Sequence, residues 1–287
     1  MTTAAALAPS SATLPASAEE YTSSNSPTLL DSARDLWSYR ELFFYLAWRD
    51  ITIRYRQTIL GATWAVLQPL ITMLVFTFLF GVVVKVDRGG IPAPIFYFSA
   101  LLPWMYFAAT VASAGNSLVS NGDLIKKVYF PRLILPGAGA LVGLADMAIG
   151  AVILVGMMSY YSVLSWRLIF WLPLTVLLFA FSFGIGVILS ALNVKYRDVR
   201  HAIPFLIQIW MFLTPVIYPT KAIPNQFRLL LALNPLSGII EAFRWTVAPS
   251  VPLDRSSLSL SIGATILVLA IGTIYFRRVE AYFTDIV

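Results

Sequence analysis

The sequence contains no cysteine and only one histidine, His201, in 287 residues. The missing thiols exclude disulfides and thiolate metal sites, and a single imidazole cannot build a histidine metal cluster, so no metal site is expected. Charged residues are also scarce, at 12% of the chain against about 25% in soluble domains. Because 59% of the residues are hydrophobic, the chain is predicted to fold in lipid, and its net charge of +6 is attributed to membrane topology rather than to nucleic-acid binding.

The sequence also lacks two features that would indicate ATP binding or catalysis by this chain. The sequence has no G-x-x-x-x-G-K-[ST] phosphate-binding loop, so the chain is not expected to bind ATP itself. Its carboxylates Asp123, Asp198 and Glu241 are scattered rather than paired, and no catalytic residue is predicted. A stand-alone secondary transporter would show internal repeats and broken, charged spans, and neither pattern is clear. A membrane-embedded transferase and a secondary transporter are therefore kept only as alternatives.

The first 35 residues differ from the rest of the chain. They are rich in Ala, Ser, Thr and Pro and contain no Lys or Arg before Arg34. A secretory signal would need a basic start and an apolar run of about 7–15 residues, and both are missing. Residues 1–35 are therefore predicted to be a disordered cytoplasmic tail.

Apolar stretches that suggest transmembrane helices recur along the rest of the chain. The sequence predicts six of them, at residues 62–84, 95–119, 133–161, 168–191, 203–218 and 258–276. Most Lys and Arg residues then fall on one side, which the positive-inside rule makes cytoplasmic, together with both termini. Asp146 is the clear charge inside a span, and it is interpreted as a structural partner for a neighbouring helix, with a functional role as the alternative. The fold class predicted is an all-α polytopic membrane protein, with its six-helix transmembrane domain in residues 61–287.

The segment at residues 219–257 is unlike an ordinary external loop. It contains two short apolar pieces, broken at Asn234-Pro235, and each is too short to span a bilayer. Short re-entrant or interfacial helices before the last span are predicted, forming a gate-like segment on the external side. A helical hairpin that rests on the outer leaflet is the alternative.

Residues 36–60 are predicted to form an amphipathic interface helix on the cytoplasmic leaflet. On a helical wheel, Arg49 and Arg56 fall on a polar face, while Asp50 and Arg54 fall among apolar residues, four positions apart, where they are expected to pair. The helix would lie flat and turn into the first span near Gly61. It is interpreted as a lipid anchor, with a docking collar for a cytoplasmic partner as the alternative.

Three motifs, in this order, resemble the membrane subunits of type-2 ABC exporters, above all the O-antigen, capsule and teichoic acid permeases. The first is R-Y-x-x-T-x-L-G-x-x-W-x-x-x-x-P, found here from Arg54 to Pro69. The second, Asn193–Pro219, contains N-x-x-x-R-D and then T-P-V-I-Y. The third, NPLSGIIEAFRW, runs from Asn234 to Trp245. The resemblance extends from about Leu36 to the C-terminus.

The resemblance implies a homodimer above two copies of a separate ABC ATPase, which would hold ATP and Mg²⁺, since this chain holds no cofactor. The cargo would be a lipid-linked polysaccharide exported across the cytoplasmic (inner) membrane, with another lipid or drug cargo as the alternative. The loop SNGDLIKKVYFPR, capped at Ser120 or Asn121 and stopped by Pro131, would form a short coupling helix. The residues implied to couple to the ATPase are Asp123, Leu124, Ile125, Lys126, Lys127, Arg49 and Arg54.

Two further groups of residues are candidates for contact with such a cargo. Cations near the inner leaflet attract anionic groups, and the candidates for binding a pyrophosphate head group are Arg54, Arg56, Lys195, Arg197 and Arg200. The alternative for the loop that holds Lys195, Arg197 and Arg200 is that its charges only set the membrane topology. Sugar rings stack on aromatic side chains, and the candidates for a channel lining are Tyr97, Trp104, Tyr106, Trp210, Phe212 and Tyr218.

Overall fold

The computed structural model of the chain describes residues 38–56, 63–128, 130–196, 198–224, 226, 231, 233–248 and 252–280. The tail predicted for residues 1–35 and the turn predicted at Gly61 lie outside these ranges. Within them the secondary structure is helical and contains no strand. The prediction of an all-α polytopic membrane fold is confirmed.

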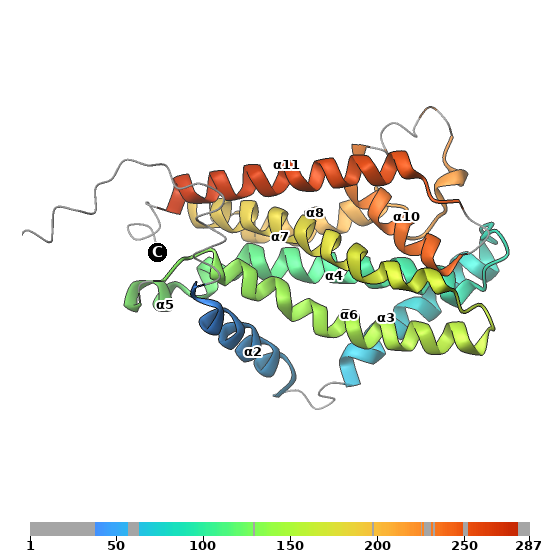
Figure 1. Ribbon diagram of the computed structural model, residues 1–287, viewed down its shortest axis with the longest axis horizontal. Helices are drawn as coiled ribbons and strands as arrows, with labels where there is room; N and C mark the ends of the chain where they lie inside the picture. Colours follow the sequence, from blue (N-terminus) through green and yellow to red (C-terminus); the bar gives the residue numbers. More distant parts are fainter. Residues whose placement is uncertain are drawn as a thin grey trace, which may run out of the picture.

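Long helices run side by side along the bundle, and shorter ones flank them (Figure 1). The π-helix η2 extends α3, and the 3₁₀-helix η3 leads directly into α7. The elements are α2 (Arg40–Arg56), α3 (Thr63–Phe76), η2 (Thr77–Val83), α4 (Ala93–Ser120), α5 (Gly122–Lys127), α6 (Ile134–Tyr160), η3 (Trp166–Phe170), α7 (Trp171–Lys195), α8 (Val199–Phe212), η4 (Thr220–Ala222), α10 (Pro235–Val247) and α11 (Arg255–Glu280).

Five of the six predicted spans correspond to helices that are long and apolar enough to cross a membrane. The exception is the predicted span 203–218, which is represented by α8 with only 14 residues. At 1.5 Å per residue α8 is about 21 Å long, less than the roughly 30 Å of a hydrocarbon core. The count of six full spans is therefore not confirmed.

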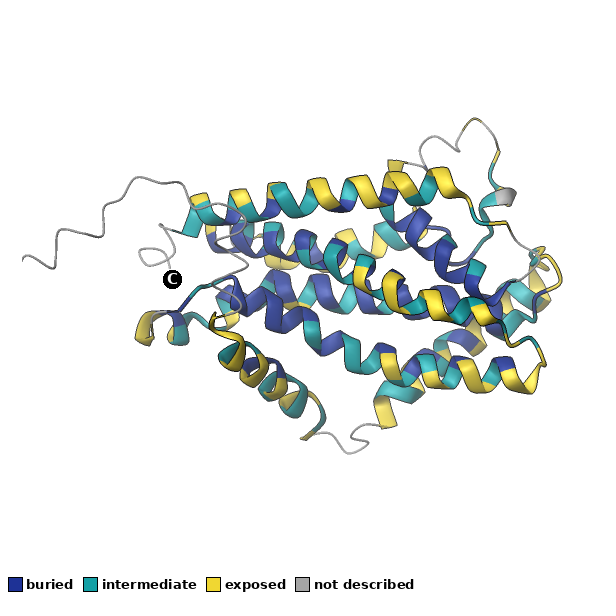
Figure 2. Cartoon of the chain, viewed as in Figure 1, coloured by how far each residue is buried: buried dark blue, intermediate teal, exposed yellow. Residues whose placement is uncertain are grey.

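The core is built around α4, which packs against α6, α7 and α10. In α4, 78% of the apolar window is buried, whereas in α3 with η2 only 11% is buried. Figure 2 shows the buried residues concentrated in the middle of the bundle. The apolar character of α4 therefore stabilises the chain's own core, and that of α3 is left for lipid or for another protein surface.

Helix α2 lies within residues 36–60, where the interface helix was predicted, and one of its faces packs on α6. Leu46 and Ala47 are buried there, while Phe44, Tyr45 and Trp48 are exposed on the opposite side. The helix starts beside the beginning of α6 and runs obliquely along its first half (Figure 1). Its predicted place in the plane of the leaflet stays a prediction.

Helix α10 is enclosed by the bundle between α11, α4 and α7, and most of its 13 residues are buried. The alternative of a helix resting on the outer leaflet is therefore wrong for α10. The preceding apolar piece lies largely outside the described residues. Asn234 begins α10 by accepting a hydrogen bond from the Leu236 N–H, with Pro235 at the first helical position, where its missing N–H costs nothing.

Replacement of Gly238 by alanine should destabilise the packing of α10 on α11. A Cβ at Gly238 would lie 2.5 Å from the Ser257 carbonyl oxygen, and backbone atoms there cannot easily move away. Overpacking of this kind typically costs about 1–3 kcal/mol, so Gly238→Ala should lower the melting temperature in detergent by several degrees. The matched control is Gly263→Ala on α11, where an added Cβ meets nothing within 4 Å. Equal melting of the two variants would contradict the expectation.

Candidate functional site

One end of the bundle gathers the short helix α5, the connection from α7 to α8 and the last turn of α11; we call it the basic end (Figure 1). Each of these segments carries exposed cations, namely Lys126, Lys127, Lys195, Arg200 and Arg278. The loops at the other end connect η2 to α4, α6 to η3 and α10 to α11. The basic end thus contains α5, the segment for which the resemblance implies contact with a separate ATPase.

Helix α5 lies at the position predicted for the coupling helix. The Asn121 carbonyl accepts the first helical bonds, from the N–H groups of Leu124 and Ile125, at 3.0 and 3.1 Å. The Asn121 side chain does not cap the helix, because its oxygen accepts from the Arg49 guanidinium and its amide donates to the Ser117 carbonyl. The helix ends at Lys127, four residues before Pro131.

The predicted coupling residues of α5 divide into two groups. Ile125 is 7% exposed and packs inward with Leu46 and Leu118, so it anchors α5 to the bundle. Leu124 is partly buried, and Asp123, Lys126 and Lys127 are exposed. A partner would contact the charged residues, while Ile125 would act by holding the helix in place.

Arg49 connects α2 to the start of α5. Its guanidinium donates to the Asn121 side-chain oxygen at 2.9 Å and forms an ion pair with Asp50 at 2.7 Å. Two elements assigned to coupling, α2 and α5, thus meet through one arginine. The predicted pair between Asp50 and Arg54 is wrong, because Asp50 bonds to Arg49.

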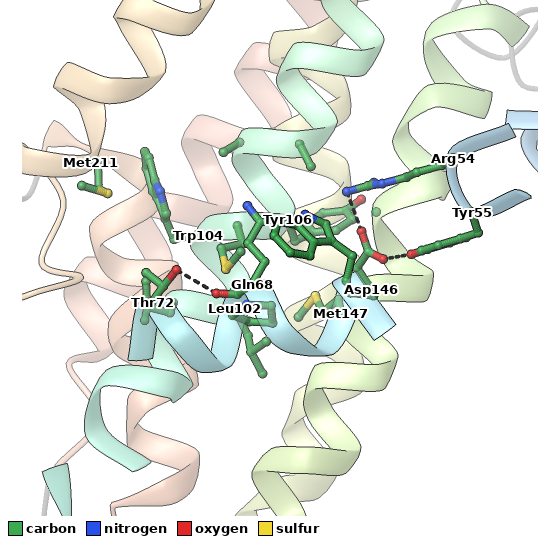
Figure 3. Close-up of a pocket in the computed structure, with 18 residues that line it drawn as sticks. Arg54, Tyr55, Gln68, Thr72, Leu102, Trp104, Tyr106, Asp146, Met147 and Met211 are labelled. Atoms are coloured by element: carbon green, nitrogen blue, oxygen red, sulfur yellow. Dashed lines mark hydrogen bonds and ion pairs between the residues drawn. The ribbon is translucent and has the colours of Figure 1, made fainter. Parts of the chain in front are cut away.

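Arg54 instead reaches α6, where its guanidinium lies 2.9 Å from the Asp146 carboxylate. The Tyr55 hydroxyl donates a hydrogen bond to the other oxygen of Asp146. Burial, followed by the bond to Asp146, raises the pKa of Tyr55 to about 12, so the phenol remains a donor at neutral pH. Figure 3 shows Arg54 and Tyr55 reaching from α2 toward Asp146. Asp146 thus has the partner on a neighbouring helix that the structural interpretation expected, namely α2, and its functional role stays a prediction.

A cavity of about 420 Å³ lies next to this ion pair (Figure 3). It is lined from α3 by Trp64 and Gln68, from α4 by Trp104 and Tyr106, and from α8 by Met211. Its size falls within the roughly 300–1,000 Å³ of small-molecule sites. Aromatic and polar side chains thus meet in one place, next to a charge pair.

The other aromatic candidates lie elsewhere. Tyr97 is fully buried, with its ring edge-on to Phe96. Trp210 is partly buried, and its indole N–H donates to the Asn234 side chain at 2.9 Å. Phe212 is exposed at the end of α8, and its carbonyl accepts the Tyr218 hydroxyl. Of the six predicted aromatic residues, the structure brings only Trp104 and Tyr106 to the cavity.

The predicted head-group cations do not all share one site. Arg54 is paired with Asp146, and Arg56 is exposed at the end of α2. Lys195 and Arg200 flank the connection between α7 and α8, and Arg197 lies outside the described residues. The exposed cations Lys195 and Arg200 therefore lie together at the α7–α8 connection. Arg54 lies apart from them and pairs with Asp146.

Three asparagine and arginine residues have roles that the sequence analysis missed, although they belong to the motifs quoted above. Buried Asn193 donates to the Gly115 carbonyl and to the Asn116 side chain, both at 3.0 Å, and so joins α7 to α4. Asn234 and Arg244 bind the turn after α8 through several hydrogen bonds. The sequence motifs point to these three residues, but they do not give the partners of the side chains, because those partners depend on how the helices pack.

Comparison with known proteins matches residues 41–247 to the family model of the ABC-2 type transporter. The chain belongs to the ABC-2 type transporter family. This membership makes it a transport subunit and not an enzyme. The match covers α5, the Asp146 pair, α10 and all but the first residue of α2, whereas α11 lies beyond it.

Several named relatives share nearly the whole chain. The O-antigen export system permease protein RfbA of Myxococcus xanthus is 31% identical over 254 residues, covering 87% of this chain and 96% of its own length. An RfbA of Klebsiella pneumoniae is 27% identical, with 86% and 95% covered. The polysialic acid transport protein KpsM of Escherichia coli is 25% identical, with 83% and 93% covered.

Substitution of Arg49 by glutamine should weaken the connection between α2 and α5. The loss of a charge-assisted hydrogen bond on a half-exposed side chain costs about 1 kcal/mol, so transport by the assembled complex should fall roughly fivefold. Substrate transport and ATP turnover should be measured together, because ATP turnover is expected to change less. Arg255→Gln, an exposed arginine at the start of α11 and at the opposite end of the bundle, is the control. Equal transport by both variants would exclude the role of Arg49.

Proposed function

We propose that this chain is the transmembrane subunit of an ATP-driven exporter of a lipid-linked polysaccharide, resembling O-antigen or teichoic acid, across the cytoplasmic membrane. The observation that carries the proposal is the set of relatives, which are named as O-antigen and polysialic acid transport proteins and match over 93–96% of their own lengths. A separate ABC ATPase would bind ATP and Mg²⁺. Both termini and the basic end would face the cytoplasm, in agreement with the positive-inside rule.

The coupling path in this proposal starts at α5. The ATPase would contact Asp123, Lys126 and Lys127, and its movement would pass to α2 through the bond between Arg49 and Asn121. From α2 it would reach the middle of α6 through Arg54 and Asp146. Within the chain, each step uses a charged or hydrogen-bonded contact that joins two helices.

A second copy of the chain would complete the membrane domain. Two faces are apolar and poorly buried: Leu74 and Phe78 lie exposed on α3 and η2, and Phe205 and Ile209 on α8. In α8 only Ile203 is buried. The cavity beside Trp104 has walls from both α3 and α8, so dimerisation through these helices would place it at a shared pathway.

The test is reconstitution with candidate ABC ATPases of the same genome. Co-purification of one ATPase, ATP turnover that requires this chain, and loss of surface polysaccharide on deletion are the expected results. Absence of an ATPase partner would overturn the proposal. If an ATPase co-purifies but the surface polysaccharide is unchanged, the transporter has another cargo, such as a lipid or a drug, and the polysaccharide assignment fails.

A further inference from the structure

The turn that follows α8 is buried, although its backbone is not helical. Helix α8 ends at Phe212, and Thr214, Pro215, Val216 and Ile217 are all buried. The last carbonyls of any helix lack partners within that helix, and an unpaired carbonyl away from water costs several kcal/mol. Non-helical backbone at membrane depth is tolerated only where protein groups satisfy it. This turn therefore requires donors from another element.

Asn234 and Arg244 of the third motif supply those donors. The Asn234 amide donates to the Leu213 carbonyl at 3.1 Å and to the Thr214 hydroxyl at 2.9 Å. The Arg244 guanidinium donates to the Pro215 and Val216 carbonyls at 2.9 and 3.1 Å. We call Asn234, Arg244 and the turn 213–218 the outer clamp.

Arg244 is held in place by its surroundings. It is 4% exposed, and its guanidinium lies over the Phe96 ring of α4 at 4.1 Å. Its other terminal nitrogen lies 3.4 Å from the Tyr218 carbonyl. Helix α10 is itself fixed to α11, because the Ser261 hydroxyl donates to the Pro235 carbonyl at 2.7 Å. The turn is thus attached to α4, α10 and α11 at once.

The outer clamp also controls the inward side of α8. The Asn234 side-chain oxygen accepts the Trp210 indole N–H, one turn before the buried turn begins. The next residue, Met211, lines the cavity between α3, α4 and α6. A shift of the turn away from Asn234 would therefore release Trp210 and move the α8 wall of that cavity.

We infer that Asn234 and Arg244 are positioning residues whose hydrogen bonds hold the turn 213–218 in place and seal the external end of the translocation pathway. The inference rests on the proposed function for the existence of a pathway, but it does not depend on the cargo. In the resting transporter the bonded turn blocks small solutes. Opening requires the turn and α10 to move together or these bonds to break.

The test is the ATP-independent leak of a small fluorescent dye from proteoliposomes that contain the complete complex. Asn234→Asp keeps an acceptor for the Leu236 N–H and for Trp210 but removes both amide donors. Arg244→Lys keeps the positive charge but loses the planar fork that reaches adjacent carbonyls. Each variant should increase the dye leak at least about fivefold, which corresponds to about 1 kcal/mol. Loss of a contact that plays no part in the seal would leave the leak unchanged. The matched control is Arg255→Lys, an exposed arginine at the same end of the bundle.

Wild-type tightness in the assembled variants would overturn the inference, whether or not export is lost. If neither variant assembles, hydrogen exchange on the wild-type complex decides. The amides of residues 214, 216–218 and 236–240 should lose protection together when ATP and vanadate trap the transporter, and independent exchange overturns the inference. Leaky variants of a complex whose wild type exports no polysaccharide would support the outer clamp and contradict the proposed cargo. Tight variants of a complex whose wild type exports polysaccharide would contradict the outer clamp and leave the proposed cargo standing.

Discussion

Reversal of both lysine charges in α5, Lys126→Glu with Lys127→Glu, is expected to reduce export at least about tenfold, a loss of about 1.4 kcal/mol in coupling. Both side chains are exposed, so the substitution removes no packing within the chain. At a protein interface, however, reversed charges meet groups that complement lysine, and like charges there cost several kcal/mol. Export, ATP turnover and co-purification of the ATPase should be measured on the same preparation.

The control for this variant is Lys85→Glu, a similarly exposed lysine at the opposite end of the bundle. It should leave export and ATPase binding unchanged, and both variants should melt like the wild type. Normal export by the double variant would show that α5 does not contact the ATPase. An equal loss in the control would show that net charge alone, rather than the position of α5, is responsible.

Removal of the carboxylate in Asp146→Leu is expected to have the second large effect. It removes the carboxylate to which the Arg54 guanidinium and the Tyr55 hydroxyl bond, and it leaves the Arg54 charge beside an apolar helix. Breaking a buried ion pair typically lowers the free energy of unfolding by about 3–5 kcal/mol. Because the Arg54 side chain is 42% exposed, we expect a smaller loss here, about 2 kcal/mol. The melting temperature should fall by several degrees, and export should fall with it.

A double-mutant cycle separates stability from coupling at this pair. Replacement of both charges, Arg54→Met with Asp146→Leu, should recover most of the lost stability, because no unpaired charge remains. If the pair also transmits movement from α2 to α6, export stays low in the stable double variant. Full recovery of export would show that the pair serves only the fold. If the double variant stays as unstable as Asp146→Leu, the unpaired Arg54 charge is not the cause of the lost stability.

The missed contacts of the sequence analysis share a physical cause. Asp50 and Arg54 have the spacing of a helical pair, yet each found a better partner, Arg49 in one case and Asp146 on α6 in the other. Helical spacing gives at most about 0.5 kcal/mol to such a pair. A charged side chain in an apolar setting is stabilised more by a partner from another helix than by a neighbour on its own helix. Helical spacing cannot predict such a partner, because the partner depends on how the helices pack.

The residues by themselves determined the class of protein, the approximate course of the apolar helices and the short helix α5, because lipid requires long apolar runs with internal hydrogen bonds and few charges. They also pointed to the motifs at Arg54, Asn193 and Asn234. Only the tertiary structure decided that α8 stops short of a full span and that α10 is enclosed in the bundle. It did so because the buried carbonyls after α8 need donors, and Asn234 and Arg244 reach them only after α10 has packed between α4 and α11.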